Sequence, residues 1–266
     1  MAKIPLWLEM KGRRVLVVGG GRVGARRALY FRSAGAEVRV VGLDFSRELI
    51  DAARRDDRLK LVSLNVLEDA RGLEELVEWA DIVVVATSSP AANEKVWAIA
   101  SARRKWVNDA TDASRTEIVV PYRAAVLDDA VEIAVTSLGK SGVVARNIRD
   151  IAVECIEENS MIKLLYQVMW RVKPVLKTLI KDGRLRFPAY LSIEEAVKEV
   201  LRKGQGLNDA LKAAAEKIVE HASRHGIVVN RDEVLDALMS VKEPVKPLGN
   251  PREQEARRGE GGQPPP

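Results

Sequence analysis

The stretch RVLVVGGGRVGARRALYFRSAGAEVRVVGLD, residues 14–44, most limits what this chain can fold into. Residues 15–18 are a short continuous apolar run, which is typical of a strand buried on both faces of a parallel sheet. Three glycines follow directly, then apolar residues at helical spacing, then a second apolar run that ends in an acid. The order of strand, tight turn, helix and strand predicts a βαβ unit.

Gly19, Gly21 and Gly24 match the pattern G-x-G-x-x-G. In that pattern the first glycine allows a sharp turn, the second lets a pyrophosphate approach the backbone, and the third lets the helix pack closely on the strand. The helix directs its unpaired N–H groups and its positive dipole end at the phosphate. We therefore predict a dinucleotide site that includes Arg22 and Val23; the alternative is a glycine-rich turn of another α/β protein.

Asp44 lies 20 positions after Gly24, near the end of the predicted second strand. An acid at that place can accept hydrogen bonds from the adenosine ribose. It can equally be an ordinary acid at the start of the next helix, before Ser46. Arg47 keeps NADP⁺ possible, because a cation there could meet a 2′-phosphate, but we favour NAD⁺ as the cofactor.

Strands and helices keep alternating after this unit. Apolar runs predict strands at 59–64, 81–89 and 105–108, and helical spacing separates them, as in 93–103. We therefore expect an α/β, Rossmann-type, doubly wound parallel sheet with its ligand crevice beyond the carboxyl ends of the strands. The small polar residues that would line that edge are Thr87, Ser88, Ser89 and Asn108.

The pattern changes after residue 112. Residues 117–137 predict two or three strands without intervening helices, and a helix follows from Ser141. The remainder is expected to be helical, with a helix end at Asp182–Gly183 and a capping-box start at Ser192. Pro174 interrupts one of these helices or marks a boundary within it. The apolar face of the helix from Ser141 consists of Val144, Ile148, Ile151, Ala152 and Cys155.

We predict four parts: an NAD-binding domain at 1–112, a small α+β dimerisation and substrate segment at 113–150, a helical domain at 151–242, and a disordered tail at 243–266. The tail is rich in proline, glycine and charge.

Composition excludes several classes of protein. A hydrophobic content of 47% over 266 residues excludes wholesale disorder. The formal charge of +5 is mild, and basic residues are mixed with acids, so nucleic acid is not an expected partner. No apolar run approaches the roughly 18 residues that span a bilayer, and no signal peptide is recognisable. A single cysteine excludes an internal disulfide and suits a reducing cytoplasm.

The first half of the chain resembles the N-terminal module of siroheme synthase, the precorrin-2 dehydrogenase/sirohydrochlorin ferrochelatase family. Four stretches carry the likeness: IPLWLEMKGRRVLVVGGGRVGARRA (4–28), VVVATSSPAANEKV (83–96), VNDATDASRTEIVVP (107–121) and IAVTSLGKSGVVARNIR (133–149). Their order and spacing agree over about residues 4–150.

The resemblance implies a defined chemistry. Precorrin-2, an octacarboxylate tetrapyrrole, loses a hydride to NAD⁺ and protons to give sirohydrochlorin, and many members then insert Fe²⁺ in the same cleft. It also implies an intertwined homodimer in which residues 113–150 cross between subunits. The alternative is a carrier or partner protein that kept the fold and the tetrapyrrole or nucleotide binding but lost catalysis; a nucleotide-sensing domain would leave the 107–149 blocks unexplained.

The family pattern assigns Thr87 and Ser88 to the nicotinamide half of the cofactor, and Asn108 to the nicotinamide or to loop order. It places its key aspartate, a proton acceptor and metal-site candidate, where this chain has Thr111. A neutral hydroxyl is a poor base, so Thr111 does not simply inherit that role. Asp112 is the leading candidate base and possible metal ligand if the loop shifts by one residue, and Glu117 ranks second; Asp112 could also be a solvated loop acid.

The last block predicts contacts to the substrate. Ser137, Gly139, Lys140 and Ser141 match the family signature before the long helix, with Leu138 in place of one glycine and Gly142 in place of proline. A helix N-terminus with hydroxyls and a lysine suits a carboxylate. Arg146, one helical turn further along, could pair with an acetate or propionate arm. Helix capping and a surface cation are the alternative interpretation.

Overall fold

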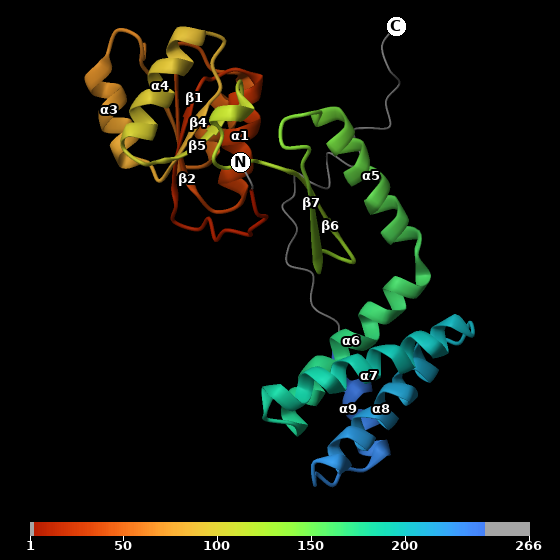
Figure 1. Ribbon diagram of the computed structural model, residues 1–266. Coiled ribbons are helices and arrows are strands. Elements are labelled where there is room, and N and C mark those ends of the chain that lie inside the picture. Colours follow the sequence, from red (N-terminus) through yellow and green to blue (C-terminus); the bar gives the residue numbers. More distant parts are fainter. Residues whose placement is uncertain (1–2, 243–266) are drawn as a thin grey trace, which may run out of the picture. The chain divides into compact units, whose positions relative to one another are not determined.

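A computed structural model describes residues 3–242 (Figure 1). The described chain forms two compact units. One contains residues 3–121 and 136–142, and the other contains 122–135 and 143–242. The chain therefore leaves the first unit after residue 121, returns to it at 136 and leaves it again after 142.

The first unit holds a five-stranded parallel sheet in the order β3-β2-β1-β4-β5. This strand order confirms the predicted doubly wound, Rossmann-type sheet. The order reverses between β1 and β4, and a crevice beyond the strand ends at such a point is the usual ligand site of this architecture. The strands are β1 (Arg14–Val18), β2 (Glu37–Gly42), β3 (Leu59–Ser63), β4 (Ile82–Val85) and β5 (Trp106–Asp109).

Helices cover both faces of the sheet. Val15 and Val17 of β1 pack with α1 and α2, whereas Leu16 and Val18 pack with α3 and α4. Alternate residues of each strand thus enter opposite cores, which explains why the strands are continuous apolar runs. The helices are α1 (Arg22–Ser33), α2 (Arg47–Arg55), α3 (Ala70–Trp79) and α4 (Pro90–Ala102). Ser46, Asp69 and Ser89 cap the last three through side-chain oxygens that accept backbone N–H groups.

The second unit joins an antiparallel hairpin to a helical bundle. The hairpin consists of β6 (Tyr122–Val126) and β7 (Val131–Val135). The bundle core is built from apolar residues such as Val172, Leu176, Ile193, Ala214 and Leu238. The helices are α5 (Gly142–Glu158), α6 (Ser160–Leu179), α7 (Gly183–Arg202), α8 (Leu207–Arg224) and α9 (Arg231–Ser240).

Two expectations about the helices were wrong. Ser192 does not start a helix, because it lies inside α7 and its hydroxyl donates to Ala189 O at 3.0 Å. The helix begins instead after Asp182, whose carboxylate accepts the Arg184 N–H at 2.9 Å. Pro174 lies within α6 without ending it, and the interruption falls at Asn159, which separates α5 from α6 and caps α6.

The 117–137 segment contains two strands, as the prediction of two or three allows, and residues 117–121 form none. The expected packing of α5 needs correction. Cys155 is exposed, and along α5 only Ala145 is fully buried, so the predicted apolar face is not covered within the described chain.

The predicted tail, 243–266, lies outside the described residues. Within residues 3–242, no helix combines the length and the apolar character needed to cross a bilayer.

Candidate functional site

The glycine turn after β1 is shaped by close approaches of the backbone. Gly19 has φ +121°, and a Cβ there would lie 2.3 Å from Ala86 O, just beyond β4. A Cβ at Gly24 would lie 1.8 Å from Gly19 O, so helix and strand approach too closely for any side chain. At Gly21, by contrast, a Cβ would meet nothing within 4 Å. Gly19 and Gly24 are therefore needed for packing, whereas the packing places no such demand on Gly21.

Gly20 is a further position where the turn needs glycine, and the motif did not identify it. A Cβ there would lie 2.1 Å from Asp44 O, and the Ser46 N–H donates to Gly20 O at 2.9 Å. The turn is thus in contact with the segment after β2, where the exposed Asp44 stands, as its predicted ribose role requires. The run of three consecutive glycines was the available signal, because the pattern needs only the first and third of them.

The first residues of α1 lie beside this turn. Arg22 and Val23 follow Gly21 directly, and both are exposed. Arg47 opens α2, its side chain is 96% exposed, and its nearest carboxylate, on Asp51, is 3.9 Å away.

Thr87 and Asn93 form a polar cluster beyond β4. The Thr87 hydroxyl donates to Asn93 Oδ1 at 2.6 Å, and Asn93 Nδ2 donates back to Thr87 O at 3.1 Å. Asn93 lies in the first turn of α4 and is buried. Sequence reasoning assigned it only to a helix, although a buried amide four residues after a capping serine was a possible signal. Ser88, between β4 and α4, is exposed.

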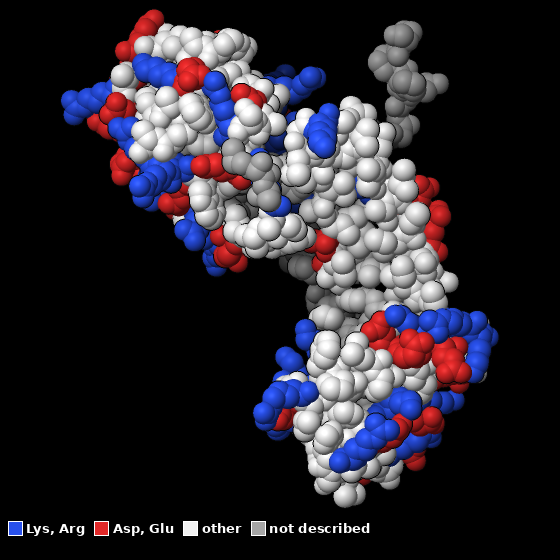
Figure 2. Space-filling view, in the orientation of Figure 1, with Lys and Arg blue, Asp and Glu red and all other residues white. Residues whose placement is uncertain are grey.

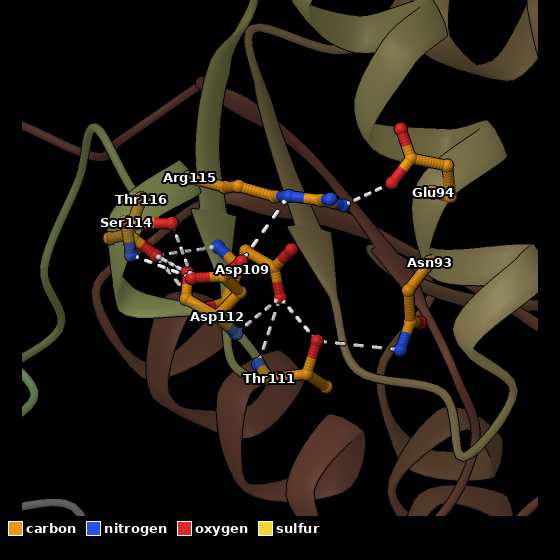
Figure 3. Close-up of polar contacts among 8 residues, drawn as sticks. All are labelled: Asn93, Glu94, Asp109, Thr111, Asp112, Ser114, Arg115 and Thr116. Atoms are coloured by element: carbon orange, nitrogen blue, oxygen red, sulfur yellow. Dashed lines mark hydrogen bonds and ion pairs between the residues drawn. The ribbon is translucent and has the colours of Figure 1, made fainter.

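The loop after β5 is organised by Asp109 (Figure 3). Its Oδ1 accepts hydrogen bonds from the Thr111 N–H at 2.8 Å, the Thr111 hydroxyl at 2.7 Å and the Asp112 N–H at 3.1 Å. Thr116 closes the loop, because its hydroxyl donates to Asp109 O and accepts from the Asp109 N–H. Asp109 is 5% exposed and its Oδ2 is buried, with no hydrogen-bond partner among the described residues.

Asp112, the leading candidate base, is engaged with its own neighbours. Its Oδ1 accepts from the Ser114 hydroxyl at 2.6 Å and the Ser114 N–H at 2.8 Å, and Arg115 Nε lies 3.3 Å from Oδ2. The Ser114 hydrogen bonds, with Arg115, lower the pKa of Asp112 below its usual value. A carboxylate held ionised in this way is a weaker proton acceptor than an unconstrained one.

Two further candidates lie along β5. Asn108 is buried, and its Nδ2 donates to Ile118 O at 2.7 Å, which fits the loop-ordering role. Glu117 is exposed and its Oε2 accepts the Val107 N–H at 3.1 Å, so it is bonded to the edge of the strand two residues before Asp109.

The signature loop 136–141 contacts the loop after β5. A Cβ at Gly139 would lie 2.4 Å from the Cβ of Ala113, the residue after Asp112. Ser137 Oγ accepts the Ser141 N–H at 2.8 Å, directly before α5, as helix capping predicts. Lys140 is exposed, in the first unit, whereas Arg146 is exposed in the second. The structure therefore brings the 107–121 block together with Ser137, Lys140 and Ser141.

Comparison with known proteins agrees with this geometry. Residues 6–122 match the model of the NAD_binding_7 family, described as "Putative NAD(P)-binding". The chain is 34% identical over 151 residues to siroheme synthase 1 of Yersinia enterocolitica, covering 56% of this chain and 30% of that protein. It is 30% identical over 213 residues to siroheme synthase of Mannheimia succiniciproducens, covering 75% and 43%. The chain thus spans less than half the length of these relatives.

A solved structure shares the fold. SirC, a precorrin-2 dehydrogenase, superposes with a TM-score of 0.54 at 22% sequence identity, covering 72% of this chain and 89% of that one.

Proposed function

The siroheme synthase relatives and the NAD(P)-binding match support the precorrin-2 dehydrogenase and siroheme synthase family for this chain, and on that premise we propose that it oxidises precorrin-2 to sirohydrochlorin with NAD⁺. The observation that carries the proposal is the glycine turn. Gly21 faces open space, while Gly19 and Gly20 before it approach Ala86 O and Asp44 O, and a bound pyrophosphate would need such space. The nicotinamide would take the hydride, while the protein supplies position and electrostatics.

The substrate side of the proposal rests on the two loops that touch each other. Thr111 and Asp112 follow β5, and the 136–141 loop, with Lys140, contacts Ala113. An exposed lysine and hydroxyls before a helix suit the carboxylates of a tetrapyrrole. We place the substrate against these loops of the first unit. Asp44, Thr87, Ser88 and Asn108 remain the predicted cofactor residues.

The assay that tests this proposal supplies precorrin-2 and NAD⁺ without oxygen and follows NADH formation and the sirohydrochlorin spectrum. We expect both signals to appear together, faster with NAD⁺ than with NADP⁺. Binding of both ligands without turnover would contradict the proposal and support the carrier. A second arm of the assay adds Fe²⁺ after oxidation, because many members of the family insert it. Formation of siroheme would show that the chain also has ferrochelatase activity.

One observation favours the carrier as the second candidate. Thr111 stands where the family has its aspartate, and Asp112 is tied to Ser114 and Arg115. If neither side chain could remove a proton, the fold would bind its ligands without reacting.

We also propose that the chain acts as a homodimer in the cytoplasm. Ile148 and Ile151 on α5 are 51% and 60% exposed, and Val143 is 63% exposed. Figure 2 shows a largely uncharged surface over α5. An apolar helix face of this kind is typical of a surface that a partner covers. The chain's single cysteine supports a reducing compartment.

A further inference from the structure

Asp109 is a buried carboxylate that none of the predicted roles uses. It is 5% exposed, makes no ion pair within residues 3–242, and leaves Oδ2 buried without a hydrogen-bond partner in that part of the chain. Burying a charged group that is incompletely paired is costly. A buried polar atom without a partner in a folded protein calls for a specific explanation, and a catalytic role is one such explanation.

Thr111 connects this carboxylate to the surface. Thr111 is exposed. Its hydroxyl donates its only proton to Asp109 Oδ1 at 2.7 Å. Asn93 Nδ2, held by Thr87, points at the same hydroxyl oxygen from 3.4 Å (Figure 3). Because the proton is directed at Asp109 and Asn93 occupies one lone pair of Thr111 Oγ1, one lone pair is left that can accept a proton from outside.

We propose that Thr111 and Asp109 form a proton relay: Thr111 Oγ1 takes a proton from the bound substrate while its own proton passes to Asp109 Oδ1. The inference rests on the proposed function and specifies its base. A hydroxyl alone is a poor base, but a carboxylate in hydrogen-bond contact removes its proton as the new one arrives. Thr111 is then the catalytic residue, and Asp109 is the positioning residue that acts through it.

The step balances with the oxidation. One C–H bond of the macrocycle breaks with its electron pair leaving as hydride to NAD⁺. A neighbouring C–H or N–H bond breaks with its electrons kept as a new double bond, and that proton goes to Thr111 Oγ1. The neutral Asp109 that results returns its proton through Thr111 to solvent after the product leaves. The NAD⁺ is the only oxidant needed.

The relay explains the loop better than Asp112 does. Asp112 is held by Ser114 and Arg115, which keep its pKa low. Asp109 also accepts three hydrogen bonds, two of them from Thr111, but all three fall on Oδ1, and its Oδ2 has no partner among the described residues. Those bonds hold the Thr111 hydroxyl in one orientation, which is the pre-organisation that a proton transfer requires.

The decisive experiment compares Thr111→Val with Thr111→Ser in the full-length chain. Valine has the shape of threonine without the hydroxyl, and serine restores the hydroxyl. We expect kcat for precorrin-2 oxidation to fall about 100-fold or more in Thr111→Val and to stay within about tenfold of the parent in Thr111→Ser. The Kd for NAD⁺, measured by calorimetry, should change by less than about twofold in both. Thr178→Val, in the second unit, is the matched control and should leave kcat unchanged.

Asp109→Asn tests the carboxylate itself, since its amide can still accept from Thr111 but cannot take the proton. Its kcat should fall as far as that of Thr111→Val, with KM nearly unchanged. If Asp109→Asn does not fold, the comparison of Thr111→Val with Thr111→Ser decides the question. Full activity of Thr111→Val, or loss of activity in Asp112→Ala only, would overturn the relay. Absence of turnover in the parent protein would instead contradict the proposed function.

Discussion

At the scale of single residues, Leu138 adopts a conformation that its side chain disfavours. Its φ is +53°, in the left-handed region, whereas Gly139 beside it has φ +88° without penalty. A left-handed conformation costs an L-residue roughly 1–2 kcal/mol. The Leu138 side chain is 51% exposed, so burial offsets only part of that cost. The family signature has glycine here, and the backbone still has the shape that glycine allows.

We expect Leu138→Gly to raise the free energy of unfolding by up to about 1 kcal/mol, because glycine adopts this φ without strain. The gain is limited because glycine loses more backbone conformational entropy on folding than leucine does. Urea unfolding followed by circular dichroism measures the change. Leu67→Gly is the matched control: Leu67 is 46% exposed and has no positive φ, so it should lose stability. Equal losses in both variants would show that Leu138 is not strained.

At the scale of elements, the junction of β1 and α1 uses its glycines for two different purposes. Gly24 brings the helix against the Gly19 carbonyl, whereas Gly21 borders open space. The first contact stabilises the fold, and the second leaves room for a phosphate. The G-x-G-x-x-G pattern alone does not separate these contributions.

An alanine at each position should separate them. In Gly24→Ala a methyl would stand 1.8 Å from a backbone oxygen, so we expect a loss of roughly 2 kcal/mol or more in the free energy of unfolding. Gly21→Ala should unfold near the parent temperature but bind NAD⁺ at least about tenfold more weakly, because the methyl occupies the phosphate position. Calorimetric titration and thermal unfolding measure both quantities. Unchanged NAD⁺ affinity in Gly21→Ala would mean that the dinucleotide binds elsewhere.

At the scale of the whole molecule, α5 has an apolar face that residues 3–242 leave exposed. Ile148 and Ile151 lie on it, with Val143 at its start. Burying such side chains removes about 25 cal/mol of free energy for each Å² of apolar surface taken from water. A second copy of the chain would supply that burial.

We therefore expect sedimentation velocity to show a dimer for the parent protein and a shift towards monomer for Ile148→Asp, since a charge in an apolar interface is costly. Val228→Asp is the control, because Val228 is 96% exposed and lies in the loop between α8 and α9. A parent protein that sediments as a monomer at every concentration would contradict the dimer, and so would an Ile148→Asp variant that remains dimeric.

The sequence by itself determined the βαβ start, the parallel sheet and the glycine turn. These depend on local signals: apolar runs long enough for one strand, helical spacing between them, and glycines at fixed intervals. The order of the blocks also predicted that Thr111 and Asp112 would stand beyond β5. The helical half was less predictable, because a capping pattern such as Ser192 with Glu195 is weak evidence when the same residues also fit the interior of a longer helix, here α7.

Only the tertiary structure decided which polar groups are buried and what they contact. Gly20 is explained by Asp44 O, 24 residues along the chain, and Asn93 by Thr87 and Thr111. Asp109 looked like one acid among several in a polar loop, yet folding buries it behind Thr111. Some of these contacts join residues distant in the sequence and others join near neighbours, but the spacing of residue types does not show which polar side chains folding will bury.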